Sequence, residues 1–216
     1  MLSSVILQNV LPKVFVGTKS GEDPSDLWLR EVTFRRGESV LVEAASGRGK
    51  TSLCAFLTAL REDFVGSIDY VADDGQKIRV ASAELLRNHL AMLFQDCRLF
   101  PELTAVENVM LKNQLTDFTS EAAIRQQLER LDLGQCLDRP CATLSLGQQQ
   151  RVAFVRALCQ PCDFLLLDEP VSHLDAANAA VMADMVRERQ TSDGIGLIVT
   201  SVGHRLPYAY QHILQL

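Results

Sequence analysis

The chain has 216 residues, of which 47% are hydrophobic and 22% are charged. These are ordinary values for a globular protein, and they exclude a disordered chain. Lysine and arginine number 21 against 27 aspartates and glutamates, a net charge of −6. That balance argues against nucleic-acid binding through a broad basic surface, so we expect no nucleic acid among the partners.

The N-terminal part of the chain is predicted to form strands and turns, followed by one helix. Alternating or apolar runs predict six strands, at residues 5–7, 14–16, 27–34, 39–43, 67–71 and 77–80. The last two strands flank Asp73-Asp74-Gly75, which is a hairpin signal. The polar stretch at 17–25 predicts a loop, and the apolar pattern at 50–60 predicts a helix.

The C-terminal part alternates between helices and buried strands. Helical patterns dominate from about 95 to 159, with one helix opening at Ser120 and running to Leu131. Apolar runs at 163–167 and 196–200 predict strands buried on both faces, with a helix between them at 176–189 and an edge strand at 213–216. This alternation predicts an α/β fold with a mostly parallel sheet. The helical stretch has the character of an inserted subdomain.

The N-terminal segment and the cysteines bear on targeting and on metal binding. No apolar run reaches the ~18 residues that a membrane-spanning helix needs. Met1–Leu7 lacks a positively charged segment and predicts a strand rather than a signal peptide, so we expect a cytoplasmic chain that meets a membrane only through a partner. Some of the cysteines could be spaced as a loose zinc ribbon, but small buried thiols are the favoured interpretation. The cysteines stand at positions 54, 97, 136, 141, 159 and 162.

The clearest chemical signal is the segment Ser46-Gly47-Arg48-Gly49-Lys50-Thr51-Ser52, which follows a predicted strand and opens a predicted helix. A Gly-rich turn in this context points backbone N–H groups and a helix N-terminus at phosphate oxygens. Lys50 would reach the β- and γ-phosphates, and Thr51 would place its hydroxyl on Mg²⁺. The pattern G-x-x-x-x-G-K-[ST] expects glycine where this chain has Ala44. If that position needs a positive φ, alanine costs about 1 kcal/mol or more.

A second signal is the apolar strand Phe164–Leu167, which ends in the adjacent carboxylates Asp168 and Glu169. Ligands bind at the carboxyl edge of parallel sheets. Asp168 would help to hold Mg²⁺ through water, and Glu169 would orient or deprotonate the attacking water. A plain strand end is the alternative, and the presence of the loop at 46–52 argues against it.

A third signal is Leu144-Ser145-Leu146-Gly147-Gln148-Gln149-Gln150-Arg151, which resembles the L-S-G-G-Q-x-Q-R signature of ATP-binding cassette (ABC) proteins. Leu93-Phe94-Gln95-Asp96 is similar to the family's Q-loop, and Ser172-His173-Leu174-Asp175 to its D-loop. The resemblance covers essentially the whole chain. It implies an ABC ATPase fold of the P-loop NTPase type, with a mostly parallel core sheet, an antiparallel β subdomain and an inserted α-helical subdomain. The implied boundaries are 1–94 and 160–216 for the nucleotide-binding core with the β subdomain, and 95–159 for the helical subdomain with the signature motif.

The resemblance also implies a nucleotide site shared by two chains. In the family, ATP is held at a head-to-tail dimer interface, where one chain supplies the phosphate-binding loop and the other its signature motif. Here the signature residues are Ser145, Gly147 and Gln148, which precede or open a helix and so can face the γ-phosphate. We therefore expect ATP and Mg²⁺ as ligands and a second ABC ATPase chain, in a homodimer formed on ATP binding, as a partner.

Further site residues follow from the same resemblance. Gln95 would sense Mg²⁺ and the γ-phosphate, and Asp175 of the D-loop is counted among the nucleotide-binding residues. Phe15 is the first candidate for the aromatic ring that stacks on adenine. Trp28 is the second candidate, although its predicted strand context favours a core role.

Two departures from the family pattern concern activity. Leu146 stands where the family usually has glycine, and we expect a modest effect. The family's switch histidine normally follows the strand at 196–200, but an ungapped match places Ser201 there, and His204 fits only if the loop is three residues longer. Both assignments stay open, and His204 could also be an exposed loop residue. Because Glu169 is present we predict ATP hydrolysis, and the displaced or replaced histidine predicts a slow rate. The remaining histidines are predicted to lie on the surface, His173 near the dimer interface: His89, His173 and His212.

The stretch from Phe94 to Val109 resembles the compact bacterial ABC ATPases of lipoprotein release, macrolide efflux and cell division. Residues 96–103 would lie where such proteins dock a short helix of an integral membrane subunit. The implied role is the ATPase subunit of a membrane transporter, peripheral on the inner face of the cell membrane. The alternatives are a signalling complex that moves no substrate and a soluble ABC ATPase. An exposed apolar groove beside 96–103 would favour a membrane partner.

Overall fold

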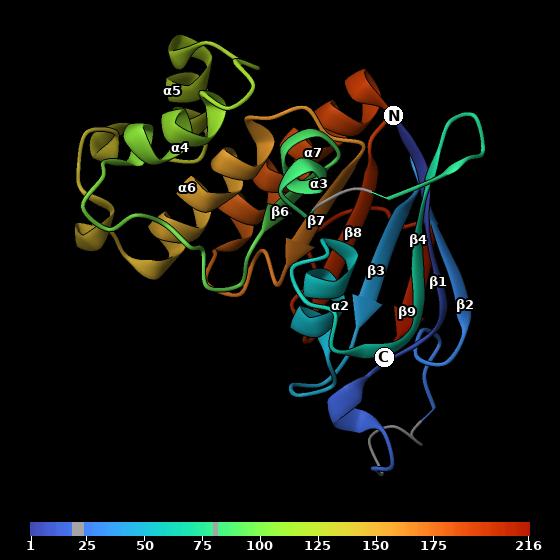
Figure 1. Cartoon of the computed structure of the whole chain (residues 1–216). Helices are drawn as coiled ribbons and strands as arrows, with labels where there is room; N and C mark the ends of the chain where they lie inside the picture. The colour runs from blue at the N-terminus through green and yellow to red at the C-terminus, as the bar shows by residue number, and fades with distance from the viewer. Residues whose placement is uncertain (19–23, 80–81) are drawn as a thin grey trace.

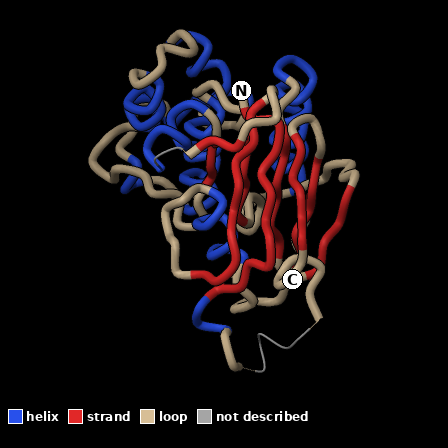
Figure 2. Tube along the Cα trace, turned by 45° about the vertical axis from the view of Figure 1, so that its right-hand side comes forward, coloured by secondary structure: helices blue, strands red, loops and turns tan. Residues whose placement is uncertain are grey.

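The computed structural model describes residues 1–18, 24–79 and 82–216. Two sheets stand beside a group of helices (Figure 1), and the strands gather together with most helices beside and behind them (Figure 2). The first sheet is parallel throughout, in the order β6 (Leu90–Leu93), β7 (Phe164–Asp168), β8 (Gly196–Ser201), β3 (Ser39–Glu43) and β9 (His212–Gln215). The second is antiparallel, in the order β2 (Glu31–Arg35), β1 (Leu2–Pro12), β4 (Phe64–Ala72) and β5 (Lys77–Ile78).

The parallel sheet is buried on both faces, as its continuous apolar runs predict. Alternate residues of its strands enter two different cores, because successive side chains of a strand point to opposite faces. Leu165 and Leu167 of β7 pack into the core that holds the helices, whereas Phe164 and Leu166 pack into the core beneath the antiparallel sheet. The sheet is therefore the shared wall between the two cores.

The described part of the chain also contains six α-helices, and five of them have 13 residues or fewer, so they depend on tertiary packing. The first three helices that follow β6 lie together on the side of the molecule away from the antiparallel sheet (Figure 1). Thr104 and Ser145 begin two of them with capping boxes, formed with Glu107 and Gln148 respectively. The helices are α2 (Lys50–Leu57), α3 (Ser82–Asn88), α4 (Ala105–Asn113), α5 (Glu121–Arg130), α6 (Leu146–Leu158) and α7 (Ala176–Asp193).

Two predicted strands near the N-terminus are wrong in whole or in part. Residues 13–15 form a 3-10 helix that follows Pro12, so the predicted strand at 14–16 is absent. The predicted strand at 27–34 begins only at Glu31, because the hydroxyl of Ser25 accepts hydrogen bonds from the backbone N–H groups of Leu27 and Trp28 and holds a turn there.

Other predictions are confirmed, with some elements missed. The hairpin forms, with Tyr70 of β4 opposite Ile78 of β5, and β9 is an edge strand. Residues 19–23 of the predicted loop and Val80 of the predicted strand lie outside the described residues. The short elements α3 and β6 were not predicted. No helix within residues 1–18, 24–79 and 82–216 is both long and apolar enough to cross a bilayer.

His89 was predicted to be an ordinary surface residue, and this is wrong. Its Nδ1 lies 2.6 Å from a carboxylate oxygen of the buried Asp163, and the same oxygen accepts a hydrogen bond from the backbone N–H of Leu2 at 2.7 Å. The three residues tie the start of β1 to the start of β7. By contrast, His212 is exposed and stands 3.7 Å from Glu38.

Candidate active site

The segment from Ala44 to Gly49 connects β3 to α2 and folds as a phosphate-binding loop does. Gly49 has a φ of +98°, and a Cβ there would lie 3.0 Å from the ring of Trp28 and 3.1 Å from that of Phe15. Only glycine meets both constraints. Lys50 is buried at the start of α2, and its Nζ donates hydrogen bonds to the carbonyl oxygens of Ala44 and Ala45, each at 3.0 Å.

Ala44 does not have the backbone conformation that would favour glycine. The described residues with positive φ do not include it. Its N–H donates to the carbonyl oxygen of Ser201, and its carbonyl oxygen accepts from Lys50. The departure from the expected pattern at this position therefore carries no backbone strain.

Four side chains from three separate segments form a connected row beside this loop. The hydroxyl of Thr51 donates to Oε1 of Gln95 at 3.2 Å, and Nε2 of Gln95 donates to Oε2 of Glu169 at 3.3 Å. The other oxygen of Glu169 lies 3.6 Å from Nζ of Lys50. The row brings together a cation, a carboxylate and two uncharged side chains, Thr51 and Gln95, whose oxygens could bind a metal ion. It lies at the carboxyl ends of β3, β6 and β7.

Asp168 lies at the buried end of this row. Its Oδ1 accepts a hydrogen bond from the hydroxyl of Thr200 at 2.5 Å. Its Oδ2 is fully buried and finds no hydrogen-bond partner among the described residues. A buried carboxylate oxygen without a donor is costly unless a cation or water satisfies it, so Asp168 has the chemistry of a group that serves a cation site.

A cavity of about 400 Å³ opens over the row. Most of the nucleotide and metal residues expected from the sequence line it: Phe15, Ser46, Gly47, Gly49, Lys50, Thr51, Ser52, Gln95 and Glu169. Val14 also lines it and was not expected. Arg48 is not among the lining residues, and its carbonyl oxygen accepts a hydrogen bond from the indole N–H of Trp28 at 3.3 Å. Trp28 is buried behind the loop, in keeping with a core role.

The signature residues lie outside this cavity. Ser145 is the N-cap of α6, where its hydroxyl accepts from the N–H of Gln148 and its own N–H donates to the Gln148 side chain. A Cβ on Gly147 would lie 2.6 Å from the carbonyl oxygen of His173 in the D-loop, so this position also requires glycine. Leu146 is 63% exposed. Within one chain, the signature motif and the phosphate-binding loop are thus separate surfaces.

Two buried residues that the sequence analysis did not single out tie the signature helix to neighbouring segments. The side chain of Gln150 donates to the carbonyl oxygen of Glu169 at 2.9 Å and accepts from the N–H of His173 at 3.3 Å. Arg151 donates to the carbonyl oxygen of Gly147 at 3.2 Å and to the side chain of Asn178 at 3.1 Å. Both are the final letters of the signature pattern, which was the signal that could have identified them.

Asp175 ends the D-loop as the N-cap of α7. One of its oxygens accepts from the backbone N–H of Asn178 at 2.8 Å and the other from the Asn178 side chain at 2.9 Å. These hydrogen bonds hold the pKa of Asp175 below its ordinary value. Because Asn178 also contacts Arg151, the D-loop and the signature helix share one hydrogen-bonded network.

The two candidates for the switch position lie at the end of β8: Ser201 is its last residue, and His204 is in the loop that follows. The hydroxyl of Ser201 donates to the carbonyl oxygen of His204 at 2.9 Å and accepts from the N–H of Gly203 at 3.1 Å. His204 itself is exposed, and neither residue is among those that line the cavity. The next residue, Arg205, pairs with Glu43 through two contacts of 2.7 Å, which lower the pKa of Glu43. This pair anchors the loop to the strand that leads into the phosphate-binding loop.

Comparison with known proteins places the chain in a family. The sequence family described as "ABC transporter" matches residues 30–172. The chain is 34% identical over 178 residues to a phosphonates import ATP-binding protein, PhnC, of Rhizobium etli, covering 77% of this chain and 63% of that protein. It therefore spans less than two thirds of the length of that relative. It is 31% identical over 180 residues to the lipoprotein-releasing system ATP-binding protein LolD of Shewanella frigidimarina, covering 82% and 75%.

The fold agrees with this assignment. The dimeric bacterial ABC transporter cassette MJ0796 superposes with a TM-score of 0.75 at 23% identity, covering 91% of this chain and 87% of that one. That likeness confirms the predicted α/β cassette with its mostly parallel sheet. The relation to LolD supports the resemblance to the compact bacterial group. Because the family matches most of the length of this chain, the chain belongs to the ABC transporter ATP-binding proteins.

Proposed function

We propose that the chain is the ATP-binding and ATP-hydrolysing subunit of a membrane ABC transporter complex, in which ATP brings two cassettes together and moves a membrane partner. One observation carries the proposal. The row Thr51–Gln95–Glu169–Lys50 faces a cavity at the phosphate-binding loop. It presents a cation for phosphate and a carboxylate for water in one place.

Each residue of the row has a role in this proposal. Lys50 and the backbone N–H groups of 46–52 bind the β- and γ-phosphates, and the N-terminus of α2 adds its dipole. Phe15 stacks on adenine. Glu169 accepts a proton from, or orients, the attacking water. The hydroxyl of Thr200 donates to the carboxylate of Asp168 and accepts from the backbone N–H of Glu169, and in this way it positions both carboxylates.

The oxygen donors fit Mg²⁺. Thr51 and Gln95 would hold the ion directly, and Asp168 would hold it through water, which would satisfy the buried Oδ2 that has no donor among the described residues. When bound, Mg²⁺ neutralises charge on the phosphates. Hard oxygen ligands at this edge are what such an ion prefers.

A second copy of the chain would complete the site. Ser145, Gly147 and Gln148 lie outside the cavity of their own chain, at the N-terminus of α6, where helix dipole and backbone donors favour an anion. The MJ0796 cassette is dimeric in its solved structure. We propose a homodimer that closes on ATP, with Asp175 at the interface.

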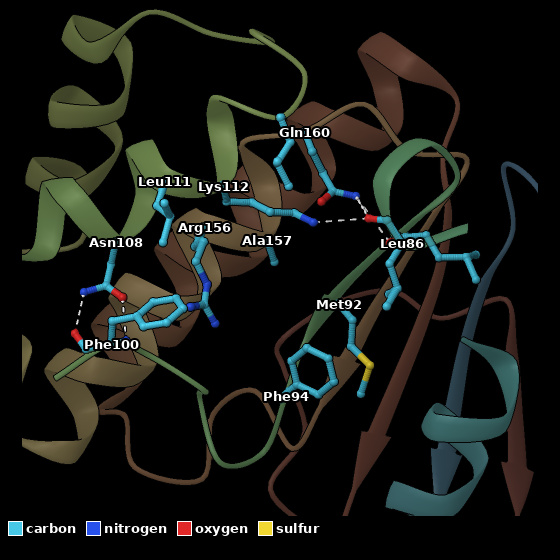
Figure 3. A pocket seen from close by; sticks show the side chains of 12 residues that line it. Leu86, Met92, Phe94, Phe100, Asn108, Leu111, Lys112, Arg156, Ala157 and Gln160 are labelled. Atoms are coloured by element: carbon cyan, nitrogen blue, oxygen red, sulfur yellow. Dashed lines mark hydrogen bonds between the residues drawn. The ribbon is translucent and has the colours of Figure 1, made fainter. Parts of the chain in front are cut away.

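The membrane partner would dock beside residues 96–103. An apolar groove of about 350 Å³ lies there, between β6 with α3 on one side and α4 with α6 on the other (Figure 3). Phe100, Leu111 and Leu115 contribute to it and are 41–51% exposed. Such a groove favours a partner-bound chain over a soluble ABC ATPase. It would fall at the boundary of the proposed core, 1–94 and 160–216, with the proposed helical subdomain, 95–159.

The proposed location follows from that partner: the inner face of the cell membrane, held by a membrane subunit. A signalling complex that moves no substrate is the alternative, and the identity of the membrane subunit separates the two. The relatives in the comparison are named for phosphonate import and lipoprotein release, which are different substrates. We therefore propose that the membrane subunit selects the transported substrate.

A steady-state ATPase assay tests the proposal. Wild type should hydrolyse ATP above the level of Glu169→Gln, which keeps the shape of the side chain and removes its charge. We propose a slow rate, since the switch position is Ser201 or the exposed His204. Alanine substitution of each, assayed beside wild type, identifies which one contributes. If wild type with its partner is no faster than Glu169→Gln, the chain is not a motor.

A further inference from the structure

The groove beside residues 96–103 contains two largely buried cations. Lys112 of α4 reaches across the groove, and its Nζ donates to the carbonyl oxygen of Leu86 at 3.2 Å (Figure 3). Arg156 of α6 lies beside Phe100, and its guanidinium donates to the carbonyl oxygens of Cys97 and Arg98 at 2.6 and 2.7 Å. Both cations are therefore fixed in place by backbone oxygens.

Neither cation forms an ion pair with a carboxylate of residues 1–18, 24–79 or 82–216. The groove lining holds no aspartate or glutamate. Asp96, whose charge raises the pKa of Arg156, forms its ion pair with Arg98 instead, at 3.2 Å. Burial is the largest cause that lowers the pKa of both Lys112 and Arg156. Carbonyl oxygens offset part of this desolvation, but full compensation of a buried charge takes a counter-charge.

The remainder of the groove is apolar on both sides of the cations. Leu86, Met92 and Phe94 line one side, and Leu111 and Leu115 line the other. A flat anionic lipid surface would meet cations that project from a protein, whereas these line a groove and are held by backbone carbonyl oxygens. The fitting occupant is a narrow segment with apolar side chains at its flanks and one negative charge at its centre.

We propose that the segment of the membrane subunit that docks here carries a glutamate or aspartate that pairs with Lys112 and Arg156. This inference rests on the proposed function, because it takes a membrane subunit as the occupant of the groove. It adds the chemistry that selects the partner: an amphipathic helix whose acidic side chain lies between apolar anchors. Apolar contacts would provide most of the buried area of the interface, and the charge pair would fix the position of the helix along the groove.

Site-specific photo-crosslinking in native membranes tests this. A benzophenone side chain replaces Leu111, which lines the groove and is exposed, and mass spectrometry maps the captured peptide. The probe is placed in wild type, Lys112→Met and Lys112→Glu. The matched control is Arg87→Glu, an equal charge reversal on an exposed cation of α3 that does not line the groove. Like Lys112, Arg87 donates to a backbone carbonyl oxygen, that of Leu115 at 3.0 Å, so both variants lose a contact of the same kind. Lys112 is the chosen variant because Arg156 also holds the backbone of residues 97–98.

The expected capture is a segment of a multi-span membrane protein with an acid within one helical turn of the attachment point. Lys112→Glu should lower capture about tenfold, because a close charge pair becomes a repulsion, while Arg87→Glu stays within about twofold. Changing the acid of the captured segment to lysine should restore capture by Lys112→Glu. Unchanged ATP binding and thermal unfolding show that the variants fold.

The outcomes separate the two proposals. A captured membrane segment without an acid, or capture that ignores Lys112→Glu, overturns the acidic partner and leaves the membrane-coupled motor intact. Capture of lipid alone also overturns the acidic partner. If the probe captures no membrane protein at all, the docking role fails as well, and the ATPase assay above then decides what remains of the proposed function.

Discussion

The side-chain amide nitrogen of Gln150 lies 2.9 Å from the backbone carbonyl oxygen of Glu169 and donates a hydrogen bond to it. The oxygen of the same amide accepts from the backbone N–H of His173. One buried side chain of α6 thus holds both the residue proposed to act on water and the loop that precedes α7. We therefore expect a displacement of the signature helix to reach Glu169 through this contact.

Replacing Gln150 with alanine should lower kcat about tenfold and leave nucleotide affinity within about twofold. Three side-chain hydrogen bonds are lost, to Glu169, Ser172 and His173. Each contributes about 1 kcal/mol, and the share that positions Glu169, about 1.4 kcal/mol, corresponds to a tenfold change in rate. Steady-state hydrolysis and a fluorescent-nucleotide titration measure the two effects. Gln149→Ala is the control, because Gln149 bonds instead to the carbonyl oxygens of Cys141 and Leu144. Equal losses in both variants would contradict a specific role.

Gly147→Ala should prevent ATP-driven dimerisation while single chains still bind nucleotide. The added methyl would stand 2.6 Å from the carbonyl oxygen of His173, and backbone has to move to admit it. Size-exclusion chromatography with ATP, in the Glu169→Gln background, reports dimerisation. Leu146→Ala is the neighbouring control, since this side chain is exposed and should be tolerated as far as folding is concerned. A Gly147→Ala chain that dimerises normally would show that the contact with the D-loop is dispensable.

The Glu43–Arg205 pair predicts a pH-dependent contribution to stability. Its hydrogen bonds hold the pKa of Glu43 below the ordinary value of 4.5. A carboxyl with a lower pKa in the folded state stabilises the fold above the unfolded pKa, and this is lost as pH falls through the folded value. Glu43→Gln should therefore unfold at lower urea than wild type at pH 7, with the difference shrinking below pH 4.5. The effect is small because Arg205 is half-exposed.

The combination of Glu43→Gln with Arg205→Gln serves as the check on this pair. If the two residues stabilise the fold only as a pair, the double variant loses less unfolding free energy than the sum of the losses of the two single variants. A difference between wild type and Glu43→Gln that stays constant from pH 7 down to about pH 2, below any folded pKa expected for this carboxyl, would mean that ionisation of Glu43 has no part in it.

Ala44→Gly tests whether alanine in place of the family's usual glycine impairs stability or nucleotide binding. Because Ala44 lacks a positive φ, glycine adds only freedom to the unfolded chain and should destabilise the protein by about 0.5–1 kcal/mol. Nucleotide affinity should not improve. Urea unfolding and a nucleotide titration measure both quantities. A more stable variant would mean that the loop prefers the left-handed conformation at this position.

Parts of the fold that are determined by local pattern were predictable from the sequence. Ser39–Glu43 is a strand at the predicted residues because an apolar run of five lies between a turn and a Gly-containing loop. The strand Phe164–Asp168 was predicted within one residue for the same reason. The 3-10 helix at 13–15 was not, since it depends on Pro12 and on packing beside Gly49.

The residues of the candidate site likewise fall into those that a local motif predicts and those that only the fold brings together. Lys50, Thr51, Asp168 and Glu169 could be proposed because a short motif surrounds each of them. The contact of His89 with Asp163 joins residues 74 positions apart, and no periodicity marks it. The cations of the groove escaped notice because Lys112 and Arg156 lie on helices whose charged residues are usually solvated.

With the proposed roles of the two residues, the 3.6 Å approach of Lys50 to Glu169 implies an order of events in turnover. One ammonium group would stand between two anions, the carboxylate and a triphosphate that enters the loop. Arriving phosphates would draw the ammonium toward them and release the carboxylate when the attacking water needs it. The proposed base would thereby stay engaged until its substrate is seated, a safeguard against untimely proton transfer that takes no residue beyond the two already present.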